Sequence, residues 1–361
     1  MSLRVALVGC GKIADAHAEQ IRRIKGCHLV GACDREELMA RQFAERFEAS
    51  RYFDNLDQLL EEARPEVVHV TTPPQSHFTI ARQCLEHGCH VYVEKPFTLD
   101  AHEAEVLVGL AEARGLRVTV GHDAQFSHAA RRMRTLIHQG YLGDTIVHME
   151  SYYGYDLGDP MYARAFLGEK GHWVRMLPGG LPQNVISHGI ARIAELLSGE
   201  NLRVIAHGFV SPFLRRLCGE EVLDELRVIV VDERGSTAYF TFSSQMRPVL
   251  HQFRVFGSRN GLVLDEQQQT VVKLRGGALK SYLERFVPPI ALARQYVGNT
   301  ARNARLFLRN DFHMEAGKRE LMAAFYRSIV EATPPPIPSS EILRTARLMD
   351  SIFEQVKIPS A

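Results

Sequence analysis

Residues 3–14 of the chain read Leu-Arg-Val-Ala-Leu-Val-Gly-Cys-Gly-Lys-Ile-Ala, and this stretch decides the fold of the first third. Its first six residues are mostly apolar, which predicts a buried strand. A G-x-G-x-x-A pattern follows, and helical periodicity continues to residue 24. A second strand is predicted at residues 28–33 and ends at Asp34. This strand, glycine turn, helix and strand, with an acid at the end, indicate a dinucleotide-binding unit.

The residues of the glycine turn have separate physical tasks. Gly9 permits the tight turn out of the strand, and Gly11 leaves room for a pyrophosphate to approach the backbone. Ala14 is small enough for close packing of the helix on the strand. The helix N-terminus, which includes Lys12 and Ile13, presents amide groups and a positive dipole end to the phosphates.

The acid at the end of the second strand predicts the cofactor. A carboxylate at Asp34 can accept hydrogen bonds from the adenosine ribose hydroxyls and would repel a 2′-phosphate. This favours NAD over NADP. The neighbouring Arg35 leaves NADP open, because an arginine there can hold a 2′-phosphate.

Strands and helices go on alternating as far as residue 121. This alternation predicts a parallel, doubly wound sheet, on which ligands bind at the carboxyl ends of the strands. The expected strands after the second are residues 66–71, 90–93 and 117–121, and the expected helices are residues 36–47, 75–87 and 100–113.

Composition limits the remaining classes of protein. The chain has 361 residues, which predicts about two domains. A hydrophobic share of 45% and a net charge of +1 argue against global disorder and against nucleic-acid binding by bulk charge. No apolar run is long enough for a membrane span, and the N-terminus is a poor signal peptide, so we expect a cytoplasmic protein. The six cysteines lack C-x-x-C spacing, which favours reduced thiols and no metal site.

Two further motifs carry a family resemblance. Residues 72–77 read Thr-Pro-Pro-Gln-Ser-His and residues 94–96 read Glu-Lys-Pro, each after an expected strand. With the glycine turn, they resemble the Gfo/Idh/MocA oxidoreductases. The resemblance implies that Thr72, Pro73, His77, Glu94 and Lys95 line the cofactor site.

The resemblance also implies an architecture. Residues 1–122 would form the NAD(P)-binding Rossmann domain, and residues 123–361 an α+β domain with a large open, mainly antiparallel sheet. Substrate would lie between the nicotinamide and that sheet, whose open face often forms the contact of a homodimer or homotetramer. The sequence after residue 122 agrees, because residues 202–264 alternate like the strands of an antiparallel meander.

Hydride transfer at a secondary alcohol needs a partner for the hydroxyl proton. Lys95 is the first candidate, because its ammonium can hold the substrate oxygen and burial would lower its pKa. The family often has an Asp one helical turn before a His, where this chain has Asn184 and His188. Asn cannot take a proton, so His188 is the expected general base and Lys95 its electrostatic partner. A structural ion pair for Lys95 and a buried, satisfied His188 are the alternatives.

Five residues are candidates for binding substrate besides Asn184. His122 and Asp123 belong to the loop of residues 121–126, where relatives often have Asn in place of Asp123 and Arg in place of Gln125. Aromatic rings and an arginine elsewhere could stack on a sugar and pair with a phosphate. These are Tyr153, Trp173 and Arg175.

The segment of residues 285–309 has five arginines, interleaved apolar residues and no acid. Its usual interpretation is a solvated helix face or a subunit contact. The sharper interpretation is a patch for a membrane surface or for a nucleotide-sugar diphosphate.

The sequence therefore predicts an NAD-dependent dehydrogenase acting on a secondary hydroxyl or carbonyl of a sugar, cyclitol or nucleotide sugar. The alternatives are a reductase of a non-sugar carbonyl, an enzyme that uses NAD without net redox change, and a catalytically silent NAD(H)-binding regulator.

Overall fold

The computed structural model describes residues 2–157, 172–199, 201–218, 222–277 and 279–356. The chain divides into two compact units. The first comprises Met1–Asp123 and Gly317–Asp350, and the second comprises Ala124–Ala316 and Ser351–Ala361.

The first unit contains a six-stranded sheet in which every strand is parallel to its neighbours. Its strand order, β3-β2-β1-β4-β5-β6, is that of a dinucleotide-binding Rossmann fold. The predicted fold class of the N-terminal region is therefore confirmed. The strands are β1 (Leu3–Val8), β2 (Cys27–Cys33), β3 (Tyr52–Phe53), β4 (Val67–Val70), β5 (His90–Val93) and β6 (Val118–Val120).

The longer helices pack on this sheet because they bury apolar side chains. In helix α1 (Lys12–Arg23), for example, Ala14 and Ala18 are fully buried in a cluster with Leu7 and Leu29 of the strands. The helices of the unit are α1 (Lys12–Arg23), α2 (Glu37–Phe47), α3 (Leu56–Gln58), α4 (His77–Glu86), α5 (Ala101–Ala113), α11 (Ala316–Val330) and α12 (Ser339–Gln355). The short β3 and α3 were not predicted from the sequence.

The two C-terminal helices change the expected domain division. The sequence analysis assigned all of residues 123–361 to the second domain, whereas the structure groups Gly317–Asp350 with the Rossmann sheet. Hydrogen bonds between these two helices and the rest of the first unit explain this grouping. The Asp350 carboxylate accepts from the Ala101 amide at 2.8 Å, and the buried Tyr326 hydroxyl lies 2.6 Å from a ring nitrogen of His69.

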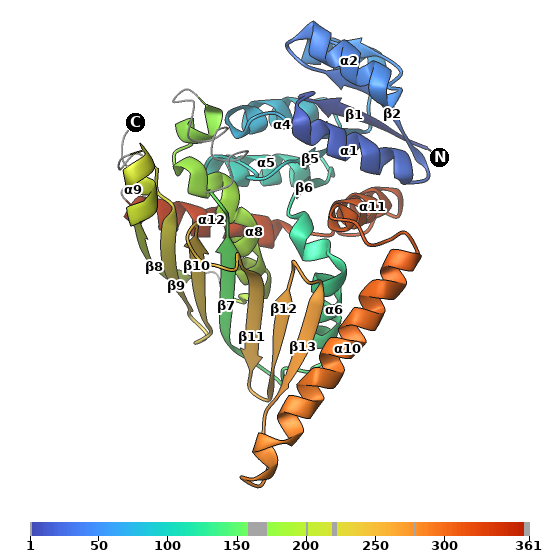
Figure 1. The fold of residues 1–361 in the computed structure, drawn as a ribbon. Helices are drawn as coiled ribbons and strands as arrows, with labels where there is room; N and C mark the ends of the chain where they lie inside the picture. The colour runs from blue at the N-terminus through green and yellow to red at the C-terminus, as the bar shows by residue number, and fades with distance from the viewer. Residues whose placement is uncertain (1, 158–171, 200, 219–221, 278, 357–361) are drawn as a thin grey trace. The chain divides into compact units, whose positions relative to one another are not determined.

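The second unit contains a seven-stranded sheet of order β13-β12-β11-β7-β10-β9-β8 (Figure 1). All pairs are antiparallel except β7 with β10, which run parallel. The mainly antiparallel open sheet is confirmed, but the simple meander was wrong, because β7 enters the sheet between β11 and β10. The strands are β7 (Ile146–Gly154), β8 (Leu202–Phe209), β9 (Glu225–Asp232), β10 (Thr237–Ser243), β11 (His251–Gly257), β12 (Asn260–Asp265) and β13 (Thr270–Arg275).

Helix α8 of the second unit (Gly180–Leu196) is buried almost throughout. Gly189 is packed so closely on the sheet that a side chain there would lie 2.5 Å from the Phe240 ring. The helices are α6 (His128–His138), α8 (Gly180–Leu196), α9 (Pro212–Cys218) and α10 (Val287–Leu308). Within the described residues, no helix is long and apolar enough to span a membrane.

Candidate active site

The glycine turn has the shape that the sequence predicts. Gly9 has φ +96°, and a side chain there would lie 2.7 Å from Thr72, so only glycine fits. A Cβ built on Gly11 meets no atom within 4 Å, so the space beside this residue is open. Helix α1 begins directly after it without a side-chain cap, which leaves the positive end of the helix to a ligand.

Asp34 is tied to the same turn. One of its carboxylate oxygens accepts from the Cys10 amide at 2.8 Å, and the other accepts from the Glu36 amide at 3.0 Å. These two bonds fix the carboxylate between the glycine turn and the start of α2. Each oxygen retains a lone pair that a ribose hydroxyl can use. Arg35 is exposed.

The buried His77 braces the loops that follow β4 and β5. Its two ring nitrogens each lie 2.9 Å from a carbonyl oxygen, one of Thr72 and the other of Pro96. Burial lowers the pKa of His77, so the neutral ring donates to one of the two carbonyls. The ring therefore positions the Thr72–Pro73 segment and the Glu-Lys-Pro segment relative to each other.

Glu94 lies at the centre of a buried polar cluster. Its Oε1 is 2.7 Å from His17 Nε2 and 3.6 Å from Lys318 Nζ, while Oε2 accepts from the Lys95 amide at 3.1 Å. Burial alone would raise the pKa of Glu94, but Lys318 and His17 outweigh it and hold the pKa well below its ordinary value. Glu94 is therefore a carboxylate at neutral pH.

A chain of buried hydrogen bonds leads away from Glu94. His17 Nδ1 lies 2.9 Å from His69 Nδ1, and His69 Nε2 lies 2.6 Å from the Tyr326 hydroxyl. Because the carboxylate can only accept, His17 donates to it from Nε2. Burial and His17 lower the pKa of His69, consistent with a neutral ring.

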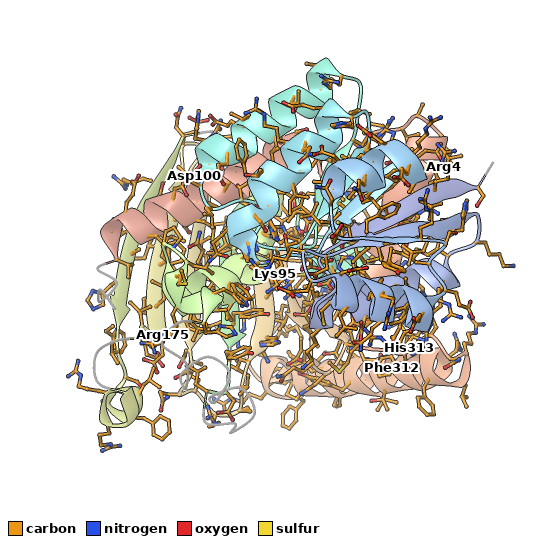
Figure 2. The ribbon with its side chains drawn as sticks, turned by 90° about the horizontal axis from the view of Figure 1, so that it is seen from above. Arg4, Lys95, Asp100, Arg175, Phe312 and His313 are labelled. Carbon is orange, nitrogen blue, oxygen red and sulfur yellow. The ribbon has the colours of Figure 1, made fainter. Side chains whose placement is uncertain are left out.

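Lys95 is the second residue after β5 and is labelled in Figure 2. Burial lowers its pKa, Glu94 and Asp123 act in the opposite direction, and Lys318 lowers it further. A lysine whose pKa is moved toward neutrality is suited to exchange a proton or to hold a developing oxyanion.

The two loop candidates after β6 lie in the same charged neighbourhood. Asp123 Oδ2 is 3.7 Å from Lys318 Nζ, which places this lysine between two carboxylates. Lys318 is itself buried. Burial lowers the pKa of His122 to about 4, so this side chain is neutral at physiological pH.

The second unit holds the other candidates. Asn184 and His188 are partly accessible, one turn apart on α8, where their neighbours in the helix are buried. The His188 ring lies 6.3 Å from the Tyr153 ring, which stacks at 4.4 Å on His251. The structure therefore brings Tyr153 and His188 into one group.

Trp173 and Arg175 lie in a short 3-10 helix, Trp173–Met176, just before α8. Both are partly buried, and the Trp173 ring is 5.5 Å from that of His172. Their part in substrate binding stays a prediction.

Lys318, His17, His69 and Tyr326 were not predicted from the sequence as site residues. His69 gave a local signal, because it interrupts the apolar run of β4. His17 gave a weaker one, as a histidine on the sheet-facing stripe of α1. Lys318 and Tyr326 gave none, since only the packing of α11 on the Rossmann unit brings them to Glu94 and His69.

The family model matches the first third of the chain, and two of its curated relatives each match less than half of it. Residues 3–122 match the family described as "Oxidoreductase family, NAD-binding Rossmann fold". The UDP-N-acetylglucosamine 3-dehydrogenase of Acidithiobacillus ferrooxidans is 33% identical over 132 residues, which is 37% of this chain and 41% of that protein. The D-glucoside 3-dehydrogenase of Escherichia coli is 30% identical over 146 residues, 40% of this chain and 42% of that protein.

The chain thus spans less than half the length of these curated relatives. Over its whole length it shares a fold with the WlbA dehydrogenase from Bordetella pertussis, solved in complex with NADH and UDP-GlcNAcA. The TM-score is 0.76 at 17% identity, covering 98% of this chain and 95% of that one. The two curated relatives named above are a nucleotide-sugar dehydrogenase and a glucoside dehydrogenase. The NAD-binding Rossmann unit, residues 3–122, is therefore the part of this chain that matches the Gfo/Idh/MocA oxidoreductases.

Proposed function

We propose that this protein is an NAD-dependent oxidoreductase acting on a secondary hydroxyl or carbonyl of a sugar, cyclitol or nucleotide sugar. One observation carries the proposal. A buried carboxylate, Glu94, and a lysine of lowered pKa, Lys95, follow β5 at the ligand-binding edge of a Rossmann sheet. The names of the relatives support the substrate class.

The glycine turn fits a dinucleotide. Gly11 leaves open space where a side chain would stand, and the uncapped start of α1 offers amide donors to a pyrophosphate. Gly9 to Ala14, Asp34 and Thr72 would hold the cofactor. When bound, the nicotinamide would supply the site that accepts or returns a hydride.

The residues of the chain would handle the proton. In alcohol oxidation the C–H hydride leaves to the cofactor, and the hydroxyl proton passes to a side-chain nitrogen. We assign this proton to His188 and the stabilisation of the alkoxide to Lys95. Asn184 cannot take a proton, but its amide can orient a hydroxyl. His122, Asp123, Tyr153, Trp173 and Arg175 are the proposed substrate contacts.

We also propose a homo-oligomer formed through the open face of the second sheet. Ile205, Ile229 and Tyr239 pair across β8, β9 and β10, and all three are exposed. This row of apolar side chains is the kind of surface that a subunit contact covers. Replacing Ile229 by Asp should lower the molecular mass in light scattering, and an unchanged mass would contradict this assignment.

The test of function is ligand binding followed by turnover. Thermal shifts are measured with NAD, NADH, NADP and NADPH, and then with NAD plus sugars, cyclitols and nucleotide sugars. A ligand at 100 times its Kd stabilises by about 2.7 kcal/mol, which a melting curve resolves. We expect a shift with NAD(H) and a second shift with one sugar class that also reduces NAD.

The control variant is Asp34→Ala, which should weaken NAD and allow NADP. Binding of NAD without turnover of any tested class, together with unchanged binding in Lys95→Met, would favour the regulator instead. No shift with any dinucleotide, after bound cofactor has been stripped, would overturn the proposal.

A further inference from the structure

Helix α10 is packed with its polar side inward. It lies along the outer edge of the second sheet, beside edge strand β13 (Figure 1). The residue that it buries most completely is Asn299, which is 1% exposed. A surface helix ordinarily buries its apolar stripe and exposes its polar one, so α10 reverses the usual pattern.

The inward face makes a ladder of amide hydrogen bonds. Gln295 accepts from the Lys273 amide at 2.8 Å and donates to the carbonyl of the same residue at 3.0 Å. Asn299 accepts from the Val271 amide at 3.5 Å and donates to its carbonyl at 3.1 Å. Gln295 and Asn299 are four residues apart in the helix, a rise of about 6 Å, and their partners in the strand are two residues apart, a rise of about 6.6 Å. The spacing of the side chains therefore matches the spacing of the strand groups that they bind. The helix thus satisfies the free edge of the sheet with side chains.

The outward face is apolar. Ile290, Val297 and Leu308 fall within about 20° of one line along the helix, at 3.6 residues per turn. Val297 is 70% exposed and Leu308 is 83% exposed. Phe307 and Tyr296 are also exposed and extend this face to one side.

The other flank of the same face is basic. Arg294, Arg305 and Arg309 project about 40° to 100° from the apolar line, on the side away from Phe307. Arg302 lies slightly beyond them, and all four arginines are exposed. Residues 285–309 contain no Asp, Glu or Lys, so five arginines give this segment a charge of +5.

We infer that α10 docks this protein on an anionic lipid surface, with the apolar line inserted among the acyl chains and the arginines on the headgroups. Charge decides between this occupant and a second copy of the helix. Pairing two copies would bring ten arginines together without an acid, whereas an anionic bilayer neutralises them and accepts the apolar side chains. The amide ladder leaves the apolar face pointing away from the sheet.

The test is flotation of the full-length protein with vesicles of phosphatidylcholine and phosphatidylglycerol, compared with phosphatidylcholine alone. We expect binding only to the mixed vesicles, and its loss at about 1 M salt, where the screening length is about 3 Å. Arg302→Gln with Arg305→Gln should weaken partitioning by about fivefold per arginine, and Val297→Asp should abolish it. We expect Arg302→Lys with Arg305→Lys to retain binding, because the anionic headgroups attract either basic side chain through its charge.

Arg215→Gln with Arg216→Gln is the matched control, since it removes two exposed arginines of α9 and should leave flotation unchanged. None of these residues belongs to the proposed active site, so dehydrogenase activity should stay the same in every variant. Absence of flotation with mixed vesicles would overturn the inference. Lipid-free self-association that Val297→Asp abolishes and Ile229→Asp does not would also overturn it, because a second copy would then cover the helix.

Discussion

Lys95 and His188, the two proposed catalytic residues, lie in contrasting surroundings. Lys95, in the first unit, is buried among charges: Glu94 and Asp123 favour its ammonium form, and Lys318 opposes it. His188, in the second unit, lies on a largely buried helix, with the amide of Asn184 one turn before it and the Tyr153 ring 6.3 Å away. The first environment is set by charged side chains, and the described neighbours of the second are an amide and an aromatic ring.

The difference separates two ways of preparing a catalytic group. The charge of Lys95 is set by carboxylates that are themselves held in place, as Glu94 is by His17 and Lys318. Such preorganised charge needs little rearrangement when an oxyanion develops. At His188 the residue one helical turn earlier is Asn184, whose amide cannot take a proton. Substitutions around Lys95 and around His188 should therefore have different effects on the kinetics.

Removing the Lys95 ammonium should have the largest effect. We expect Lys95→Met to lower kcat by about 10³-fold, within the range for loss of an acid–base or oxyanion-stabilising group. NAD affinity, measured by fluorescence titration, should change much less. Lys95→Arg is the control, because it keeps the charge but cannot deprotonate. A kcat within tenfold of the parent in Lys95→Met would contradict the assigned role.

The buried His122 should make the protein sensitive to acid. Its folded pKa is about 4, below the unfolded value of about 6.5. Between these values the unfolded chain binds a proton that the folded chain does not, so stability falls as the pH falls from 6.5 to 4, by about 3 kcal/mol at most. Urea denaturation at several pH values measures this slope. His122→Gln should flatten it, and an unchanged slope would show that other groups cause the acid sensitivity.

Lys318 should act as a positioning residue that tunes Lys95 and Glu94. Its removal in Lys318→Met takes away a cation that lowers the pKa of Lys95, so that pKa rises. The limb of the kcat/KM profile that reports Lys95 should move to higher pH by about one unit. Lys318→Arg should restore the parent profile. If Lys318→Met only lowers the melting temperature and leaves the pH profile in place, the lysine is merely structural.

Introducing the missing acid at residue 184 should have the smallest effect. In Asn184→Asp, a carboxylate one turn from His188 would favour its imidazolium form. The acid limb of kcat/KM would then move to higher pH by about 0.2 to 0.4 units, the size of an (i, i+4) interaction. The measurement is a pH–rate profile at saturating NAD. The same substitution in a His188→Asn background should produce no such shift, and a shift there would exclude His188 as its source.

Local sequence patterns were sufficient for most of the first unit. The glycine turn, Asp34 and the alternation of strands and helices predict the order of a Rossmann sheet, because parallel strands joined by helices have few ways to pack. The same patterns predict Glu94 and Lys95, since residues that follow parallel strands meet at one edge. The second unit was less predictable. Its strands were largely found, but the parallel pairing of β7 with β10 is a non-local choice that no turn signal reveals.

The sequence by itself thus determined the glycine turn and the fold class, and it predicted Glu94 and Lys95 as site residues, because these depend on backbone geometry over a few neighbouring positions. Only the tertiary structure decided which distant side chains surround Glu94 and Lys95 and influence their charge. Lys318 and Tyr326 reach the site because α11 packs on the first unit. Likewise, the inverted packing of α10 follows from the free edge of β13, whose amides and carbonyls need partners that Gln295 and Asn299 supply. Long-range hydrogen bonding and burial have no signature in a local pattern, and that is why the sequence could not predict them.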